Sequence, residues 1–167
     1  MALNIDNYSL ELARAADAPR LAVMSQKLIE SGLRPAWTAS RIGWHIRSPD
    51  SVVLTARIAS IGFGARTVAA FAIMRYGNEV AHLNLLAVDP AHRRRGIGSQ
   101  LIRWLEETAI TAGTFDIGLE LRASNASALS FYGRLGYREL GRIPGYYQGV
   151  EPAIRMSRDL RVTPAAA

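Results

Sequence analysis

The sequence predicts an α/β protein with a central mixed, largely antiparallel sheet flanked by helices. The first observation is the order of segments, because strand-like and helix-like runs alternate along the whole chain. The second is a set of three consecutive strand-like runs in the middle, which indicates an antiparallel meander. The third is a strand, helix and strand over residues 80–121, whose crossover we expect to be right-handed.

The first half of the chain is expected to form one strand, two helices and then three strands. Residues 10–14 alternate as in a strand, and Asp17 can cap a helix that Gly32 ends. A weaker helical pattern follows over residues 38–47. The three strands are expected at residues 52–59, 66–76 and 80–88, with turns at 62–64 and 77–78.

The second half is expected to form two helices and three strands. Beyond Asp89-Pro90 the hydrophobic residues recur on one helical face from Ile97 to Gly113. Residues 117–121 then alternate as in a strand. Asn125 can cap a last helix, ended by Gly136, before two closing strands near residues 137–142 and 153–159.

Length and composition indicate one globular domain. The chain has 167 residues, of which 49% are hydrophobic and 20% charged, enough for a proper core. We expect a single domain over residues 1–161. Residues 162–167, which end in Thr-Pro-Ala-Ala-Ala, are expected to be a frayed tail.

Several classes of site are excluded by composition. The chain has no cysteine, and its three histidines lack the spacing of a zinc site, so we expect no metal. The longest apolar run, residues 68–74, is far short of the ~20 residues that cross a bilayer, so we expect no membrane partner. The first residues do not form a signal peptide, which favours a cytoplasmic location.

The positive charge of the chain favours an anionic partner. The net charge is +6 and arginine carries almost all of it, because Lys27 is the single lysine. Charge alone does not choose between nucleic acid, the surface of the ribosome and a phosphorylated cofactor. An arginine-rich but otherwise ordinary surface is equally compatible.

The most informative stretch is Val88-Asp-Pro-Ala-His-Arg-Arg-Arg-Gly-Ile-Gly-Ser99. A strand ends there, the chain turns, and a helix begins at the glycines, so unpaired N–H groups and a partial positive charge face outward. Arg93, Arg94 and Arg95 add charge. The stretch lacks the Gly-Lys-Ser/Thr of a P-loop and the third glycine of a dinucleotide fingerprint, which favours a pyrophosphate that is not part of a nucleoside triphosphate.

Arg-x-x-Gly-x-Gly after a Val-Asp-Pro strand end resembles the CoA-pyrophosphate loop of the GNAT superfamily of N-acetyltransferases. The resemblance continues in Leu119-Glu-Leu-Arg-Ala-Ser-Asn125 and Phe131-Tyr-Gly-Arg-Leu-Gly-Tyr137, and by order of elements covers residues 10–160. Together with Gly145-Tyr-Tyr-Gln-Gly149 and Glu151-Pro-Ala153, these residues resemble the protein N-terminal acetyltransferases, in particular the ribosomal-protein alanine N-acetyltransferase subgroup. The resemblance implies a GNAT-like acyl-CoA N-acyltransferase fold.

The resemblance also implies acetyl-CoA as co-substrate, direct transfer to an amine, and a set of site residues. The acceptor would be a protein N-terminus, the enzyme would work in proximity to the ribosome without binding nucleic acid directly, and it would be a monomer or homodimer. The cofactor-binding residues implied are Leu86, Ala87, Val88, Arg93, Arg94, Arg95, Gly96, Ile97, Gly98, Ser99 and Asn125. Glu120 would be the general base, Tyr132 the general acid, and Tyr146 and Tyr147 would line the acceptor groove.

The chemistry of acetyl transfer needs these residue types. An α-amino group has a pKa near ~8, so a base must remove its proton before it attacks. The tetrahedral intermediate needs a fixed donor, commonly worth ~3–4 kcal/mol, which a backbone N–H near Leu86 or Ala87 would supply. A tyrosine hydroxyl can protonate the departing thiolate.

Each assignment has a simpler alternative. Glu120 could be a surface carboxylate paired with Arg122, Tyr132 a core aromatic, and Asn125 a helix cap and nothing more. The Gly145–Gly149 stretch could be a plain hairpin loop, and His82 and His92 are expected to be ordinary strand and turn residues. The acceptor could be a small amine such as a polyamine, an aminoglycoside or an amino acid, with residues 31–50 shaping its pocket, or the protein could be a non-catalytic acyl-CoA sensor.

Overall fold

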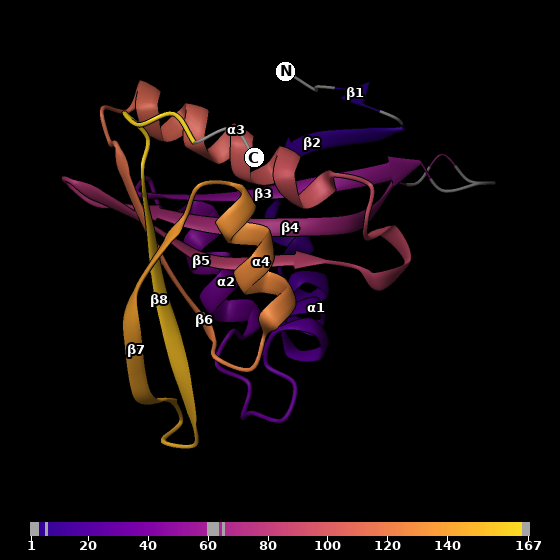
Figure 1. Ribbon diagram of the computed structural model, residues 1–167. Coiled ribbons are helices and arrows are strands. Elements are labelled where there is room, and N and C mark those ends of the chain that lie inside the picture. Colours follow the sequence, from indigo (N-terminus) through magenta and orange to yellow (C-terminus); the bar gives the residue numbers. More distant parts are fainter. Residues whose placement is uncertain (1–3, 6, 60–63, 65, 165–167) are drawn as a thin grey trace. The chain divides into compact units, whose positions relative to one another are not determined.

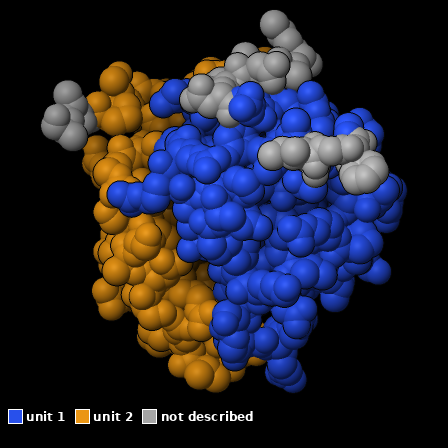
Figure 2. Space-filling view, turned by 90° about the vertical axis from the view of Figure 1, so that its right-hand side faces the viewer, with its two compact units in different colours: residues 1–75, 85–105 blue, residues 76–84, 106–167 orange. Residues whose placement is uncertain are grey.

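The computed structural model describes residues 4–5, 7–59, 64 and 66–164, and it divides the chain into two compact units. Figure 2 shows them in different colours: unit 1 is residues 1–75 and 85–105, and unit 2 is residues 76–84 and 106–167. Strand β5 and helix α3 contribute residues to both. None of the helices within the described residues is long and apolar enough to span a membrane.

Unit 1 combines antiparallel strands with two helices (Figure 1). Its strands are hydrogen-bonded in the order β1, β2, β3 and β4, each antiparallel to the next, with a bulge at Ala69 of β4 opposite Ala56 and Arg57. The elements of unit 1 are β1 (Asn4–Ile5), β2 (Tyr8–Leu12), the 3-10 turn η1 (Ala15–Asp17), α1 (Ala18–Leu28), α2 (Ala39–Arg47), β3 (Ser51–Ala59), β4 (Arg66–Tyr76, except its last residue), the end of β5 (Val80–Val88), the 3-10 turn η2 (Pro90–His92) and the start of α3 (Ile97–Thr111).

The core of unit 1 lies between α1, α2 and the strands. Phe71 and Ile73 of β4 are fully buried and pack with Leu21 of α1 and Ile42 of α2. Burial of such side chains stabilises the fold by about 25 cal/mol per Å² of apolar surface, which fixes the helices on the sheet. Leu85 and Ala87, from the end of β5, belong to the same cluster.

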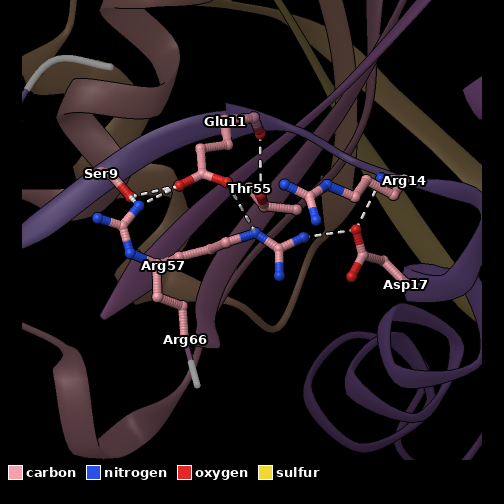
Figure 3. A network of polar contacts seen from close by, with 7 residues as sticks. All are labelled: Ser9, Glu11, Arg14, Asp17, Thr55, Arg57 and Arg66. Atoms are coloured by element: carbon pink, nitrogen blue, oxygen red, sulfur yellow. Dashed lines mark hydrogen bonds and ion pairs between the residues drawn. The ribbon is translucent and has the colours of Figure 1, made fainter. Parts of the chain in front are cut away.

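A polar network ties β2 to β3, β4 and η1 (Figure 3). Arg57 of β3 pairs with Glu11 at 3.6 Å and with Asp17 at 2.5 Å, and Arg66 donates to Glu11 at 2.5 Å. The hydroxyl of Thr55 donates to the Glu11 carbonyl oxygen at 2.8 Å. Strand β2 is therefore held by side chains as well as by its backbone ladder.

Unit 2 contains the parallel pair of the sheet. The beginning of β5 pairs in parallel with β6 (Asp116–Arg122), from Val80 opposite Asp116 to Leu83 opposite Leu119. Strand β8 (Glu151–Asp159) is antiparallel to β6 on one side and to β7 (Arg138–Tyr147) on the other. Helix α4 (Ala126–Arg134) connects β6 to β7.

The structure confirms the predicted fold class, a mixed and largely antiparallel sheet with helices. The predicted bounds of β4 and β5 are those observed, and α2 is capped by the Thr38 side chain. Other parts differ from the prediction: β1 was not predicted, β2 spans residues 8–12 and not 10–14, β7 continues to Tyr147, and β8 begins at Glu151. The expected turn at 62–64 and tail at 162–167 lie partly outside the described residues, and the single domain over residues 1–161 stays a prediction.

Candidate active site

The end of β5 leads into a sharply turned segment of unit 1. The Asp89 carboxylate caps η2 by accepting from the Ala91 amide at 3.0 Å, and Arg93 Nε donates to the Val88 carbonyl oxygen at 3.1 Å. Arg94 and Gly96 both have positive φ, 64° and 76°. The left-handed region costs little for glycine but is uncommon for arginine, so the turn holds Arg94 in a strained conformation.

Helix α3 begins directly after this turn. The Gln100 amide donates to the Gly96 carbonyl oxygen at 3.0 Å, which makes Gly96 the residue before the first turn. The amides of Ile97, Gly98 and Ser99 therefore have no acceptor within the helix. No acidic residue lies in the first turn of α3, and the side chains of Arg93, Arg94 and Arg95 are exposed. Free amides and cations at a helix N-terminus together bind phosphate.

The last residues of β5 lead to this turn from the core. Ala87 is buried, while Leu86 and Val88 are partly exposed on the opposite side of the strand. Together with Arg93, Arg94, Arg95, Gly96, Ile97, Gly98 and Ser99, these three residues lie in unit 1, so all of the predicted cofactor-binding residues except Asn125 share one unit.

Glu120 of β6 lies in unit 2 between two basic side chains. Its side chain is only 10% exposed, its Oε2 is 2.5 Å from His82 Nε2, and its Oε1 accepts from Arg155 Nε at 3.0 Å. The hydrogen bond from His82, with the charge of Arg155, lowers the pKa of Glu120 although burial acts in the opposite direction. Glu120 is thus an ionised, partly buried carboxylate at neutral pH.

The strand register explains why these three side chains meet. In the parallel pair, His82 is opposite Gly118, so it lies on the same face as Glu120 two residues further on. In the antiparallel pair, Glu120 is directly opposite Arg155. The alternative partner, Arg122, pairs with Glu151 at 2.6 Å. His82, expected to be an ordinary strand residue, is the functional candidate that the sequence did not reveal.

One tyrosine of unit 2, Tyr147, lies within electrostatic reach of this carboxylate, and Tyr132 lies within reach of Tyr147. Burial raises the pKa of Tyr147, and the nearby Tyr146 and Glu120 raise it further. Burial also raises the pKa of Tyr132, with an added contribution from Tyr147. The Tyr132 ring packs edge-on against Phe131 and Tyr137, with centroids 5.0 and 5.5 Å apart. Both hydroxyls therefore stay protonated at neutral pH.

The hairpin between β7 and β8 carries Tyr146 and Tyr147. The Gly149 amide donates to the Gly145 carbonyl oxygen at 2.9 Å, and Tyr147 is opposite Glu151 in the ladder. Tyr146 is 45% exposed, whereas Tyr147 is partly buried. The stretch forms a hairpin, which is the simpler of the two alternatives, and a role of its tyrosines in an acceptor groove stays a prediction.

Asn125 caps α4, because its Oδ1 accepts from the Ala128 amide at 3.0 Å. Its side chain is exposed, so the cap leaves its amide nitrogen facing solvent. Nearby, Glu151 accepts from both Arg122 and Ser124, which connects the loop before α4 to the start of β8. Among the described residues, no group of three or more His, Asp and Glu side chains is arranged to hold a metal ion.

Comparison with known proteins identifies the family. The family model described as Acetyltransferase (GNAT) family matches residues 26–137, more than half of the chain. The ribosomal protein bS18-alanine N-acetyltransferase of Salmonella typhimurium is 42% identical over 93 residues, which are 54% of this chain and 63% of that protein. The chain thus matches less than two thirds of the length of this curated relative.

Solved structures agree over a longer stretch. The ribosomal-protein-S18-alanine N-acetyltransferase from Escherichia coli has a TM-score of 0.75 at 26% identity, over 96% of this chain and 98% of that one. Arabidopsis thaliana NAA60 in complex with acetyl-CoA has a TM-score of 0.82, over 93% of this chain and 99% of that one, but at 17% identity it shows the fold alone. The chain belongs to the acetyltransferase (GNAT) family.

Proposed function

We propose that the protein is an acetyl-CoA-dependent N-acetyltransferase that acts on the α-amine of a protein or peptide. The observation that carries this proposal is the Glu120 carboxylate, which is partly buried, ionised and 2.5 Å from His82. Tyr147 lies within its electrostatic reach, and Tyr132 lies within reach of Tyr147. Membership of an acetyltransferase family and the names of the similar proteins support both the reaction and the acceptor.

The cofactor half of the proposal rests on unit 1. Acetyl-CoA carries a pyrophosphate, which the amides of Ile97, Gly98 and Ser99 would bind with the guanidinium groups of the preceding turn. The backbone of Leu86–Val88 would pair with the pantetheine arm and donate one N–H to the thioester oxygen. Asn125 would contact the cofactor with the amide nitrogen that its cap leaves unused. No metal is needed for this chemistry.

In the proposed reaction, Glu120 and His82 together remove the proton from the acceptor amine. The same hydrogen bond that keeps Glu120 ionised also makes it a weak base, because a lowered pKa means a lower proton affinity. Imidazole nitrogens are stronger bases than carboxylates. In the proposal, Glu120 accepts from His82 Nε2 and so orients the ring, while Nδ1 removes the proton from the amine directly or through water.

The transfer itself needs no covalent enzyme intermediate. The amine nitrogen attacks the thioester carbonyl carbon, the carbonyl oxygen becomes an oxyanion, and the carbon–sulfur bond breaks as CoA thiolate departs. The Glu120–His82 pair takes the amine proton, and Tyr132 donates its proton to the thiolate. The Tyr132 hydroxyl is protonated when the thiolate forms, although burial raises its pKa and so makes it a weaker acid than an exposed tyrosine.

The acceptor, the partners and the location remain part of the proposal. Tyr146 and Tyr147 at the hairpin would bind the first residues of a protein N-terminus, as the names of the similar ribosomal-protein acetyltransferases suggest. We expect a monomer or homodimer that works in the cytoplasm near the ribosome.

The decisive assay measures release of CoA thiol from acetyl-CoA. Short peptides that begin with Ala, Ser or Met are compared with spermidine and free lysine as acceptors. We expect turnover on peptides, with the acetyl group on the α-amine by mass spectrometry. Turnover on small amines alone would move the protein to the small-molecule acetyltransferases, and binding of acetyl-CoA without turnover on any acceptor would make it a sensor.

A further inference from the structure

Tyr8 of β2 connects two residues of the turn at residues 89–96 of unit 1, which leads into α3 and is the proposed phosphate-binding turn. Its hydroxyl oxygen accepts a hydrogen bond from Arg95 Nη1 at 2.8 Å and lies 3.2 Å from His92 Nδ1. The rings of Tyr8 and His92 also meet edge-on, with centroids 6.0 Å apart. Tyr8 therefore contacts one residue before Arg94 and one residue after it, although Tyr8 lies 84 residues before His92 in the chain.

The hydrogen bond between Arg95 and Tyr8 has a fixed direction. A guanidinium group can only donate, so the Tyr8 oxygen is the acceptor toward Arg95. The Tyr8 hydroxyl donates to His92 Nδ1 when that nitrogen carries no proton, so a chain of hydrogen bonds runs from Arg95 through Tyr8 to His92. Arg95 has five N–H donors, and within the described part of the chain one of them is seen to bind, to Tyr8, so further donors can bind an anion.

Tyr8 is a rigid support for this chain. The residue is only 8% exposed, and β2 is held by the network of Glu11, Arg57 and Asp17 shown in Figure 3. In contrast, the arginines of the turn are exposed and would otherwise lose side-chain freedom on binding a ligand. A support that orders Arg95 beforehand lowers this entropic cost of binding.

The backbone of the turn also needs support. Arg94 has a φ of 64°, a conformation that costs about 1 kcal/mol or more for a residue with a side chain. Such a conformation persists only where its neighbours are fixed on both sides. Arg93 is fixed to the Val88 carbonyl oxygen at 3.1 Å on one side, and Arg95 is fixed to Tyr8 on the other.

We propose that Tyr8 is a positioning residue for cofactor binding, which holds Arg95 and His92 so that the turn presents its N–H groups to the phosphates of acetyl-CoA. The inference rests on the proposed function, because it assigns the turn to that cofactor. Tyr8 itself does not contact the reacting atoms. Its effect is on the binding of the phosphate-bearing part of the cofactor and not on the chemical step.

The test is the substitution Tyr8→Phe, which removes the hydroxyl and keeps the ring. A hydrogen bond to a charged group contributes enough that its loss should raise the KM for acetyl-CoA about three- to tenfold. The kcat should stay within about twofold, as expected for loss of uniform binding. With acetyl-pantetheine, which lacks the phosphates, wild type and Tyr8→Phe should give the same kcat/KM.

A double-mutant cycle separates positioning from a general structural effect. We expect Tyr8→Phe to have no further effect on the acetyl-CoA KM once Arg95→Ala is present, because the hydroxyl acts through Arg95. The matched control is Tyr76→Phe, since the buried hydroxyl of Tyr76 makes no hydrogen bond within the described residues. The Tyr76→Phe control should leave the KM for acetyl-CoA and the KM for acetyl-pantetheine unchanged.

The outcomes distinguish this inference from the proposed function. An unchanged KM in Tyr8→Phe, an equal loss with acetyl-pantetheine, or an equal effect in the Arg95→Ala background would each overturn the role of Tyr8 while leaving acetyl-CoA as the cofactor. A wild-type protein that does not bind acetyl-CoA would overturn the proposed function and the inference together.

Discussion

The arginine-rich turn before α3 in unit 1 and the Glu120 cluster of unit 2 differ in how their charges are arranged. In the arginine-rich turn, three exposed arginines precede backbone amides that have no acceptor within α3. No acidic residue lies in the first turn of α3 itself. In the cluster, a carboxylate that is 10% exposed is already matched by His82 and Arg155. The turn carries unmatched positive charge, whereas the cluster is internally balanced.

The difference in charge indicates which chemical role each region can perform. Unmatched charge at a surface attracts a ligand of opposite sign, so the turn is suited to binding. A carboxylate that is hydrogen-bonded and partly shielded from water has a fixed orientation and a shifted pKa, so the cluster is suited to proton transfer. Changes in the turn should therefore alter KM, and changes in the cluster should alter kcat.

The largest effect is expected for Glu120→Gln, which removes the charge and keeps the shape. Loss of a general base or of its orienting partner lowers kcat about 10²- to 10⁴-fold. The KM for acetyl-CoA should change little. Glu107→Gln, at an exposed position of α3, is the matched control and should retain full activity. Equal kcat values for Glu120→Gln and wild type would remove Glu120 from the mechanism.

A somewhat smaller loss of kcat, about 10²-fold, is expected for His82→Gln. Glutamine can still donate to Glu120 but cannot take up a proton. The pH profile of kcat/KM separates two roles of His82, that of proton acceptor and that of orienting Glu120. Loss of the proton acceptor removes the acidic limb of the profile, whereas loss of orientation alone leaves the shape of the profile unchanged. A profile with an unchanged acidic limb would leave Glu120 to act alone, directly or through water.

The turn is tested by Ser99→Asp, for which stability and binding should change in opposite directions. A carboxylate in the first turn of α3 interacts favourably with the helix dipole and should stabilise the fold by about 0.3–1 kcal/mol. The same carboxylate repels phosphate, so the KM for acetyl-CoA should rise about tenfold or more. Ser99→Asn is the neutral control. A more stable variant with an unchanged KM would show that phosphate binds elsewhere.

The cap of α4 is expected to contribute about 1 kcal/mol to the free energy of unfolding. Asn125→Ala should lose this amount in urea denaturation, whereas Asn125→Asp should keep it, because aspartate also accepts from the Ala128 amide. If Asn125 also binds the cofactor, Asn125→Asp will be as stable as wild type and still have a raised KM. Wild-type stability and KM in both variants would contradict both roles.

The smallest effect is a pH dependence of stability. The pKa of Glu120 is lower in the folded protein than in the unfolded chain, so its ionised form stabilises the fold. This contribution is present above the unfolded pKa of about 4.3 and is lost as the pH falls through the folded pKa. The stability difference between wild type and Glu120→Gln should therefore shrink below about pH 4. A difference that grows on acidification would contradict the assigned shift.

The sequence predicted those parts of the molecule that depend on neighbouring residues. The alternation of residues 80–88 defined β5 because one face of that strand is buried and the other is not. The glycines of the turn marked the start of α3, and Gly96 indeed has a positive φ. Strand β2 was placed two residues too late because Tyr8, Ser9 and Leu10 are all buried, so its first residues do not alternate.

Contacts between distant residues were not predictable in this way. His82 and Glu120 meet through a parallel register, and Tyr8 meets Arg95 through a contact that spans 87 residues. Neither pair has a signal in the local sequence, because register and the direction of a side chain follow from the packing of whole strands. Such contacts explain why the predicted catalytic set contained Glu120 but lacked the histidine that binds it.

The assignment of cofactor binding to the turn and of proton transfer to Glu120 is tested most directly by two measurements, acetyl-CoA binding by calorimetry and turnover. Both are made on wild type, Ser99→Asp and Glu120→Gln. We expect Ser99→Asp to bind acetyl-CoA at least about tenfold more weakly than wild type. Glu120→Gln should bind it as wild type does but transfer almost no acetyl group to an alanine-initiated peptide. Loss of binding in Glu120→Gln, or full turnover by that variant, would contradict the separation of cofactor binding and proton transfer between the two regions.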